Sequence, residues 1–573
     1  MKNVFEDISF FPYLFGSLRY FLDQNQSSFL SFLHTLFLFS TKPFPEASLK
    51  TALKVIRKRG YKDAVIWAGG KRTYYDIFER TLILADSLLE MGVVPNDRLS
   101  FMSINIPQSP EIWQVCSLLG LSFIPVNWRL KAQEIKYIVE HSRTNILIYN
   151  KEHQDEINKA QLNLKIAITI DDGFDNTYEK IIYEGRKKIG VSENEDIEKR
   201  IEKISEIISK KLVSVFRQKN IKRKKDDDSG IIVYTSGTTG KPKGAHRRAE
   251  PAVGILLVAS AARELGLTRD NVHLVVSPLY HSAPFFFAQL TLALGGTLVV
   301  LPRFRVEQFF EYAHRYKATS TFIVPYMLYE ILENYDNLSK TYDISSVTHF
   351  ICGAAPLSPQ KKREFINKIG YRLYEFYGST ETSINSVLRP YDIETKAESV
   401  GRVVPFCRIK IVDDEGKECP TNKEGLIYVK SPFMMRGYYR DKSATDEISY
   451  KGYITAGDVG KLDEDGFLYI LDRKKDMIIS AGVNIYPAEI EHELIQHPSV
   501  KMCAVVGVPD EKWGEKVKAF VVLKDGHRID PKDLEMFLRE RIAGYKIPKE
   551  WEFIDSIPMT PSGKIIKREL VKR

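Results

Sequence analysis

A run of glycine, hydroxyl and lysine residues directly after an apolar segment constrains this chain more than any other feature. Residues 231–235 are typical of a β-strand, and residues 236–244 continue as Ser-Gly-Thr-Thr-Gly-Lys-Pro-Lys-Gly. Glycines let backbone N–H groups approach an anion closely, and hydroxyl groups add further donors. This pattern predicts a loop that holds the phosphates of a nucleoside triphosphate. The residues predicted to contact them are Thr235, Ser236, Gly237, Thr238, Thr239 and Lys243.

The loop differs from a Walker P-loop. Lys241 is followed by proline, and no Gly-Lys-Ser/Thr triplet occurs in the chain. The Walker signature needs that serine or threonine, because its hydroxyl binds Mg²⁺. The sequence therefore predicts a triphosphate loop of a different class.

Helical and strand-like segments alternate around this loop. Asp76 to Met91 has apolar residues at helical spacing, and residues 98–103 read as a short strand. Such alternation predicts βαβ units and a largely parallel sheet. The pattern resumes after Asp228 and continues to about Leu471. We therefore predict an α/β fold, with a large domain at 45–471 and a small α+β domain at 472–573.

The N-terminal extension, residues 1–44, is rich in aromatic residues. Its longest apolar run, residues 29–39, is interrupted by polar side chains. A membrane-spanning helix needs about 20 apolar residues. Three interpretations stay open: a helix packed on the main body, a peripheral lipid-facing helix, and a cleaved leader. The 5 dispersed cysteines indicate a reducing compartment and predict a cytoplasmic protein.

The overall charge favours a small anionic ligand. Lys and Arg number 83 against 74 Asp and Glu, a net charge of +9. Spread over this length, the excess does not indicate a nucleic-acid partner. Lys and Glu concentrate between residues 176 and 228, which predicts an exposed helix with charge pairs one turn apart, followed by a solvated linker.

Seven motifs in the same order resemble those of the AMP-forming adenylating enzymes, which include acyl-CoA synthetases, nonribosomal adenylation domains and firefly luciferase. The first is the loop itself, Tyr234–Gly244, and the resemblance covers the chain from about Ser48 onward. The other six are Pro278–His281, Gly353–Pro356, Tyr377–Thr382, Gly452–Asp458, Asp472–Gly482 and Pro558–Lys564.

The resemblance implies a reaction in two steps. A carboxylate first attacks the α-phosphate of ATP, and a thiol, usually that of CoA, then displaces AMP. It also implies that Tyr377 faces the adenine and that Asp458 accepts hydrogen bonds from the ribose. The complete set of further nucleotide contacts implied is Gly353, Ala354, Gly378 and Arg473.

Four residues are implied to act on the reacting groups. Thr380 contacts the α-phosphate, Glu381 coordinates Mg²⁺, His281 gates the acyl pocket, and Lys564 bridges the carboxylate and the α-phosphate. The family's small domain is mobile, and it rotates between the two steps about a hinge residue that corresponds to Lys475. In the second conformation Ser480 and Gly482 would line the CoA tunnel.

The acyl pocket favours an uncharged tail. Acetate-type ligases carry tryptophan at the position of Gly378, so glycine favours a larger acid. Residues 284–289, around Phe285, contain no acidic residue that could pair with an amino group. We therefore predict a medium- or long-chain fatty acyl-CoA synthetase. An aryl- or branched-acid CoA ligase, and an adenylating enzyme with another acceptor, remain as alternatives. The expected partners are the acid, ATP and CoA, with peripheral membrane contact through the N-terminus.

Overall fold

The computed structural model describes residues 16–20, 56–171, 177–192, 194–218, 229–235, 242–248, 251–474, 476–480, 483–510, 513–559 and 565–571. These residues form two compact units. Unit 1 lies within residues 1–322, 337–349 and 432–446, and unit 2 within 323–336, 350–431 and 447–573. The α/β prediction is confirmed, because sheets layered with helices make up most of the chain and a small α+β sheet follows. The predicted domain boundaries stay predictions.

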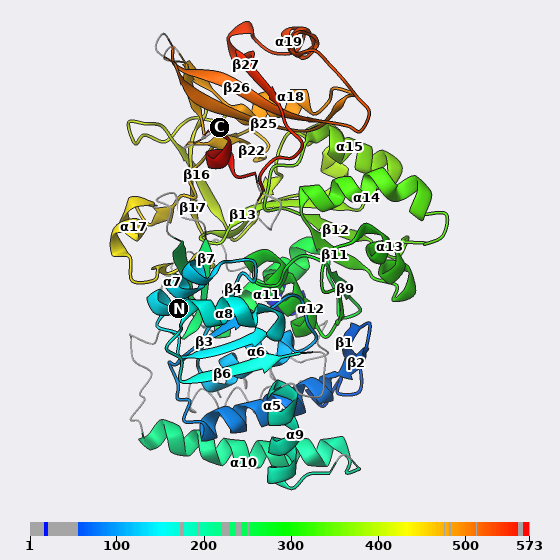
Figure 1. Ribbon diagram of the computed structural model, residues 1–573, viewed down its shortest axis with the longest axis vertical. Helices are drawn as coiled ribbons and strands as arrows, with labels where there is room; N and C mark the ends of the chain where they lie inside the picture. The colour runs from blue at the N-terminus through cyan, green and yellow to red at the C-terminus, as the bar shows by residue number, and fades with distance from the viewer. Residues whose placement is uncertain are drawn as a thin grey trace. The chain divides into compact units, whose positions relative to one another are not determined.

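Unit 1 contains a seven-stranded sheet, largely parallel, with an antiparallel edge (Figure 1). The parallel strands are apolar on both faces, as in β5, where Ile146, Leu147 and Ile148 are all fully buried. In spatial order the strands are β18 (Gly437–Tyr438), β8 (Lys243–Arg248), β7 (Gly230–Thr235), β4 (Ser122–Val126), β3 (Arg98–Met102), β5 (Ile146–Asn150) and β6 (Ile166–Ile170).

Further strands of unit 1 build a second sheet. Their pairing is parallel except for the hairpin of β1 and β2. In spatial order they are β11 (Ser320–Ile323), β9 (Val272–Val275), β10 (Thr297–Val300), β1 (Asp63–Trp67) and β2 (Gly70–Thr73). The helical elements of unit 1 are α5 (Tyr74–Glu90), α6 (Ser109–Leu119), α7 (Ala132–Ser142), η2 (Lys151–His153), α8 (Gln154–Ala160), α9 (Thr177–Ile189), α10 (Ile197–Gln218), α11 (Pro251–Leu265), α12 (Ser282–Leu294) and α13 (Val306–Arg315).

Helix α5 illustrates how local sequence sets an element. Thr73 caps its N-terminus: the Asp76 backbone N–H donates to the Thr73 hydroxyl oxygen, and the Thr73 N–H donates to the Asp76 carboxylate. This reciprocal capping box satisfies two N–H groups that the helix leaves free. Both the helix predicted from Asp76 to Met91 and the strand predicted at 98–103 are confirmed.

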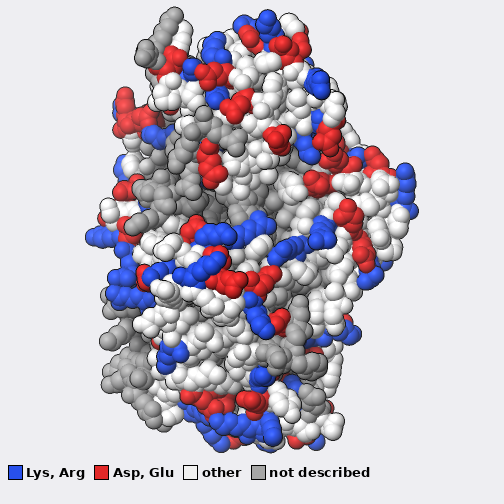
Figure 2. All heavy atoms as spheres, in the orientation of Figure 1, with Lys and Arg blue, Asp and Glu red and all other residues white. Residues whose placement is uncertain are grey.

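Helices α9 and α10 pack beside α5 (Figure 1). The prediction of an exposed helix is therefore wrong for one face of α10, because apolar residues recur every three or four positions and form a buried stripe. Lys and Glu occupy the other face, and Figure 2 shows both charges mixed along this edge of unit 1. The buried apolar residues of α10 are Ile201, Ile204, Ile208 and Leu212.

Charged side chains are also buried where α5 meets α6, α9 and α10. Glu79 of α5 is 1% exposed and pairs with Arg200 at 2.8 Å and with Arg186 at 2.9 Å. Glu111, which is fully buried, pairs with Arg80 at 2.8 Å. We call these five residues the buried ion-pair layer. Burial of a charge requires such partners, because an unpaired charge would lose its hydration without compensation.

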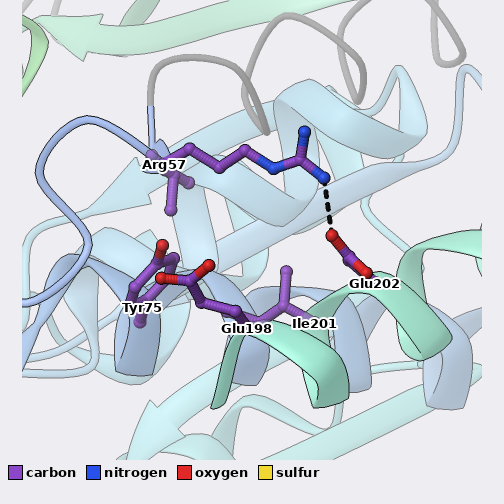
Figure 3. Close-up of a pocket in the computed structure, with 6 residues that line it drawn as sticks. Arg57, Tyr75, Glu198, Ile201 and Glu202 are labelled. Atoms are coloured by element: carbon purple, nitrogen blue, oxygen red, sulfur yellow. Dashed lines mark hydrogen bonds and ion pairs between the residues drawn. The ribbon is translucent and has the colours of Figure 1, made fainter. Parts of the chain in front are cut away.

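A small cavity lies between α5 and α10 (Figure 3). Its volume is about 10 Å³, which is room for about one water molecule. At its rim Arg57 and Glu202 form an ion pair of 2.6 Å, and the Tyr75 hydroxyl and the Glu198 carboxylate lie close together. The cavity is too small for an organic substrate.

Unit 2 contains three groups of strands. The first follows the order β15 (Arg402–Val403), β14 (Ser383–Leu388), β13 (Leu373–Ser379) and β12 (His349–Cys352). The second is antiparallel, in the order β19 (Ser449–Tyr450), β20 (Tyr453–Ile454), β17 (Gly425–Lys430), β21 (Asp458–Leu462) and β22 (Leu468–Arg473), with β16 (Arg408–Val412) also on β17. The third is β24 (Val483–Ile485), β23 (Ile478–Ser480), β26 (Gly514–Leu523) and β25 (Val500–Asp510), with β27 (Glu550–Phe553) parallel to β26.

The third sheet forms the small C-terminal α+β part. Its apolar side chains divide into two buried clusters, one containing α18 and α19 and the other containing the end of α20. The remaining helical elements are α14 (Pro325–Leu338), α15 (Pro359–Lys368), η3 (Pro390–Asp392), α16 (Ile393–Lys396), α17 (Lys442–Glu447), α18 (Pro487–Leu494), α19 (Pro531–Arg539), η4 (Gly544–Lys546) and α20 (Lys567–Leu570).

Most of the N-terminal extension and the predicted linker at 219–228 lie outside the described residues. Residues 16–20 are helical and pack on unit 1: Ser17 and Leu18 are buried, and the Tyr20 hydroxyl donates to the Leu267 carbonyl oxygen at 2.9 Å. In the part of the chain that the structure describes, no helix is both long and apolar enough to span a bilayer. Peripheral membrane contact stays a prediction.

Candidate nucleotide and acyl site

Three predicted nucleotide residues meet in unit 2. The Tyr377 hydroxyl, on β13, donates to Asp458 Oδ2 at 2.7 Å, and Arg473 Nε lies 3.3 Å from Asp458 Oδ1. Asp458 begins β21 and Arg473 ends β22, and the two residues face each other in the ladder. Burial and the neighbouring carboxylate raise the pKa of Tyr377 well above its usual value, so its hydroxyl stays protonated. The cluster fixes a buried carboxylate between two donors.

The turn after β13 carries Thr380 and Glu381. The Ser379 hydroxyl oxygen accepts hydrogen bonds from the backbone N–H groups of Glu381 and Thr382, both at 3.1 Å. A short hydroxyl side chain that bonds the backbone two residues further on is a usual way to fix a tight turn. Glu381 is 9% exposed. The turn therefore holds Thr380 and Glu381 in one defined place beside Tyr377.

Gly353 and Ala354 follow β12, alongside β13. A Cβ atom at Gly353 would lie 2.8 Å from the Phe376 ring, so a larger residue there would require the ring or the backbone to shift. Ala354 has a φ of 73°, in the left-handed region. For a residue other than glycine this conformation costs about 1–2 kcal/mol. Backbone strain of this kind concentrates at functional sites.

Unit 1 holds the ends of the glycine-rich loop. Strands β7 and β8 are antiparallel, with Thr235 opposite Lys243. The Thr235 hydroxyl donates to the Lys243 carbonyl oxygen at 3.4 Å, and Lys243 Nζ lies 5.4 Å from the centre of the Tyr438 ring. The structure thus places Thr235 and Lys243 together at the tip of a strand pair. Ser236, Gly237, Thr238 and Thr239 lie outside the described residues.

His281 precedes α12 as its N-cap residue. Its Nε2 atom is buried and, among the described residues, has no hydrogen-bond partner. Burial, with a contribution from Arg129, lowers the pKa of His281 to about 4, so the ring is neutral near pH 7. A buried polar atom without a partner is unusual in a folded protein and indicates a site that a ligand or water completes.

Phe285 lies in a buried aromatic cluster. It stacks on Phe123 with ring centres 5.4 Å apart and meets Trp113 edge to face at 5.0 Å. Its side chain is 7% exposed. Phe285 is therefore part of the packed core of unit 1, and its predicted contact with an acyl tail stays a prediction.

The C-terminal predictions are described only in part. Ser480 ends β23, is half-buried, and pairs with Val483 and Gly514. Lys475, Gly482 and Lys564 lie outside the described residues, so their roles stay predictions.

Comparison with known proteins identifies the family. Residues 53–439 match the AMP-binding enzyme family, and residues 489–564 match the AMP-binding enzyme C-terminal domain. The chain belongs to the AMP-binding enzyme family. It is thus a member of the adenylate-forming superfamily of acyl-CoA synthetases, as the seven motifs indicate.

Individual relatives cover nearly the whole chain. A feruloyl-CoA synthase from Amycolatopsis sp is 32% identical over 523 residues, which are 90% of this chain and 97% of that protein. The fatty acid–[acyl-carrier-protein] ligase ScoC from Streptomyces coeruleorubidus is 31% identical over 89% of this chain and 93% of its own. The ATP-bound structure of MatB from Rhodopseudomonas palustris is similar with a TM-score of 0.78 and 28% identity, over 92% of this chain and 98% of that one.

The site of this AMP-binding enzyme fits a nucleotide-bound Mg²⁺. Among the residues that the structure describes, no group of three or more His, Cys, Asp or Glu side chains could hold a metal. Mg²⁺ is usually bound through one or two carboxylates together with substrate phosphates. The single carboxylate of Glu381 matches that requirement, although the contact itself stays a prediction.

Sequence reasoning missed several contacts of this AMP-binding enzyme. It assigned Tyr377 a flat face for adenine but not the hydroxyl that binds Asp458, because 81 residues separate the two. It also missed Lys567, which pairs with Glu491 at 2.8 Å next to Asp472. No motif marks such long-range partners, so only the fold reveals them.

Proposed function

We propose that this protein, an adenylate-forming acid–CoA ligase, activates an acid with an uncharged apolar tail. In the first step a carboxylate oxygen bonds to the α-phosphorus of ATP and pyrophosphate leaves. In the second, the CoA sulfur bonds to the acyl carbon, AMP leaves, and the thiol proton passes to solvent. The observation that carries the proposal is the Asp458 carboxylate between Tyr377 and Arg473. Each carboxylate oxygen can accept further hydrogen bonds, which suits the two hydroxyls of a ribose.

The phosphates require positive charge and N–H donors. Thr235 and Lys243 are placed together where the glycine-rich loop leaves the sheet, which supports binding of the β- and γ-phosphates there. Thr380 is proposed to contact the α-phosphate from its fixed turn. Bound Mg²⁺ would offset the negative charge of the phosphates, with Glu381 as its protein ligand.

Lys564 is proposed to stabilise the first transition state. Its ammonium group would lie between the carboxylate and the α-phosphate as charge develops there. Rotation about Lys475 would then bring Ser480 and Gly482 to the CoA tunnel for the second step. His281, neutral near pH 7, is proposed to gate the acyl pocket without adding a charge to it.

Measuring the two half-reactions separately tests these roles. Lys564→Ala should slow acid-dependent pyrophosphate release about 10²–10³-fold, the usual loss for one charge-stabilising group. Thioester formation from preformed acyl-adenylate and CoA should remain nearly intact. An equal loss in both half-reactions would instead indicate a structural role for Lys564.

The proposed substrate is a medium- or long-chain fatty acid. Residues 284–289 contain no acidic side chain, and a fatty acid–carrier-protein ligase is 31% identical. An aryl acid is the second candidate, because a feruloyl-CoA synthase is 32% identical. A panel of alkyl and aryl acids, measured by CoA-thioester formation, decides between them. Pyrophosphate release without CoA consumption would point to another acceptor.

A further inference from the structure

The strand ends that carry the glycine-rich loop are hydrogen-bonded to helix α7. His141 Nδ1 lies 2.8 Å from the hydroxyl of Tyr234, the first residue of the loop motif, near the end of β7. The Tyr137 hydroxyl donates to the Pro242 carbonyl oxygen at 3.2 Å, one residue before β8. One helix therefore contacts the chain where the loop departs and where it returns.

Tyr137 and His141 act from the same face of α7, since residues four apart lie one above the other on a helix. Their rings stack with centres 5.4 Å apart and an interplanar angle of 24°. Each ring restricts the other, so neither hydrogen bond can shift without disturbing its neighbour.

The pair is enclosed by further rings. His141 meets Tyr439 edge to face at 6.1 Å, and Tyr439 in turn meets His246 of β8 at 6.1 Å. Arg98 lies 5.5 Å from the centre of the Tyr439 ring. Tyr439 and His246 are 7% and 5% exposed. These contacts hold the Tyr137–His141 face of α7 in place against both strand ends.

The pairing of β7 with β8 leaves room for the Tyr234 ring. Its partner in the ladder is Gly244, where a Cβ atom would approach Ile232 to 2.9 Å and the Tyr234 ring to 3.2 Å. The glycine therefore lets the tyrosine ring lie over the neighbouring strand, with its hydroxyl at His141. A larger residue at 244 would displace that hydroxyl.

The protonation states suit this hydrogen bond. Burial, with contributions from Tyr137 and Tyr439, raises the pKa of Tyr234, so its hydroxyl keeps a proton to donate. Burial and the positive charge of Arg440, opposed by Asp441, lower the pKa of His141, so the ring is neutral near pH 7. A neutral imidazole has one nitrogen free to accept.

We propose that Tyr137 and His141 are positioning residues for ATP: they fix the strand ends so that Thr235 and Lys243 stand in the register that the phosphates require. The inference rests on the proposed function, because it assumes that the triphosphate binds at this end of β7 and β8. It adds α7 to the ATP site, although neither side chain touches the nucleotide.

ATP affinity in the absence of acid is the direct test. His141→Phe and Tyr137→Phe keep a ring but remove a hydrogen bond. Each should weaken ATP–Mg²⁺ binding about three- to tenfold, the usual effect of one hydrogen bond. His141→Asn restores an acceptor near the Nδ1 position and should recover part of the loss. In the His141→Phe background, Tyr234→Phe should add little, because the two residues act through one bond.

Two controls separate positioning from general damage. Tyr183→Phe makes the same chemical change at a tyrosine of α9 that is 66% exposed, and it should leave ATP affinity unchanged. Thioester formation from preformed acyl-adenylate, which uses no triphosphate, should stay at the wild-type rate in every variant. Unchanged ATP affinity in both α7 variants would overturn the inference, as would an equal loss in both half-reactions. Failure of the wild type to release pyrophosphate with any acid would sink the proposed function instead.

Discussion

Gly378 has no room for a side chain. A Cβ atom there would lie 1.9 Å from the carbonyl oxygen of Ser383, across the hairpin of β13 and β14. The ladder is irregular at this point, and Ser383 has a φ of 71°. The sequence argument took the glycine as the opening of an acyl channel. The local backbone supplies a second reason for glycine, independent of any substrate.

Gly378→Ala should therefore damage the protein whatever acid it uses. The clash is with backbone and cannot be relieved by a rotamer change, so we expect a loss of about 1–3 kcal/mol in the free energy of unfolding. The urea midpoint measures this loss. Gly544→Ala is the matched control, because nothing lies within 4 Å of a Cβ at that position. Equal midpoints for the two variants would contradict the clash.

His281 should make stability depend on pH. Its pKa of about 4 in the folded protein lies below the ordinary value of 6.5. Between these values the unfolded chain binds a proton that the folded chain does not, so stability falls as pH drops from 6.5 towards 4. The change is at most about 1.4 kcal/mol per pKa unit. The difference between the urea midpoints of wild type and His281→Gln should shrink as pH falls. A difference that stays constant with pH would refute the lowered pKa.

At the scale of elements, α10 forms two kinds of ion pair, one with Glu79 of α5 and one with Arg57, which precedes β1. The Arg200–Glu79 pair is buried, with 8% and 1% of the side chains exposed, whereas Arg57 and Glu202 are 59% and 57% exposed. Arg200→Ala should lower the free energy of unfolding by about 3 kcal/mol, because it strips a buried carboxylate of a partner. Arg57→Ala should cost about 1 kcal/mol or less. If chemical denaturation gave similar losses in the free energy of unfolding for both variants, burial would not determine the strength of these ion pairs.

The elements also show which structural features could be predicted from the local sequence. The helix at 74–90 and the strand at 98–102 were predictable, because periodicity and a capping box mark them locally. The burial of one face of α10 was not, because its Lys and Glu content dominates the composition. Its isoleucines, read alone, carry the signal that was overlooked.

At the scale of the whole molecule, the motifs predicted the chemistry better than the geometry. They gave the family, but not that Asp458 shares its carboxylate with Tyr377, nor that Tyr137 reaches Pro242 across 105 residues. Such contacts depend on how strands far apart in sequence are ordered. Local patterns contain no information on that order.

A non-hydrolysable acyl-adenylate analogue should stabilise the protein. At a concentration 100 times its dissociation constant, a ligand of the folded state adds about 2.7 kcal/mol. Asp458→Asn should remove much of that gain at the same concentration, because it replaces the proposed ribose acceptor. Asp465→Asn, at a side chain 61% exposed, is the matched control. Hydrogen exchange of the core amides measures the stability gained on binding the analogue. An equal gain in protection in both variants would show that Asp458 is not part of the nucleotide site.

The buried ion-pair layer should also restrict which substitutions occur together among members of this family. Losing Arg200 alone leaves the buried carboxylate of Glu79 with Arg186 as its remaining ion-pair partner, whereas replacing the whole set by apolar residues of similar volume is often nearly neutral. Single substitutions should therefore be rare among relatives, and complete exchanges tolerated. In an alignment of this family, the positions of Glu79, Arg186 and Arg200 should vary together or not at all.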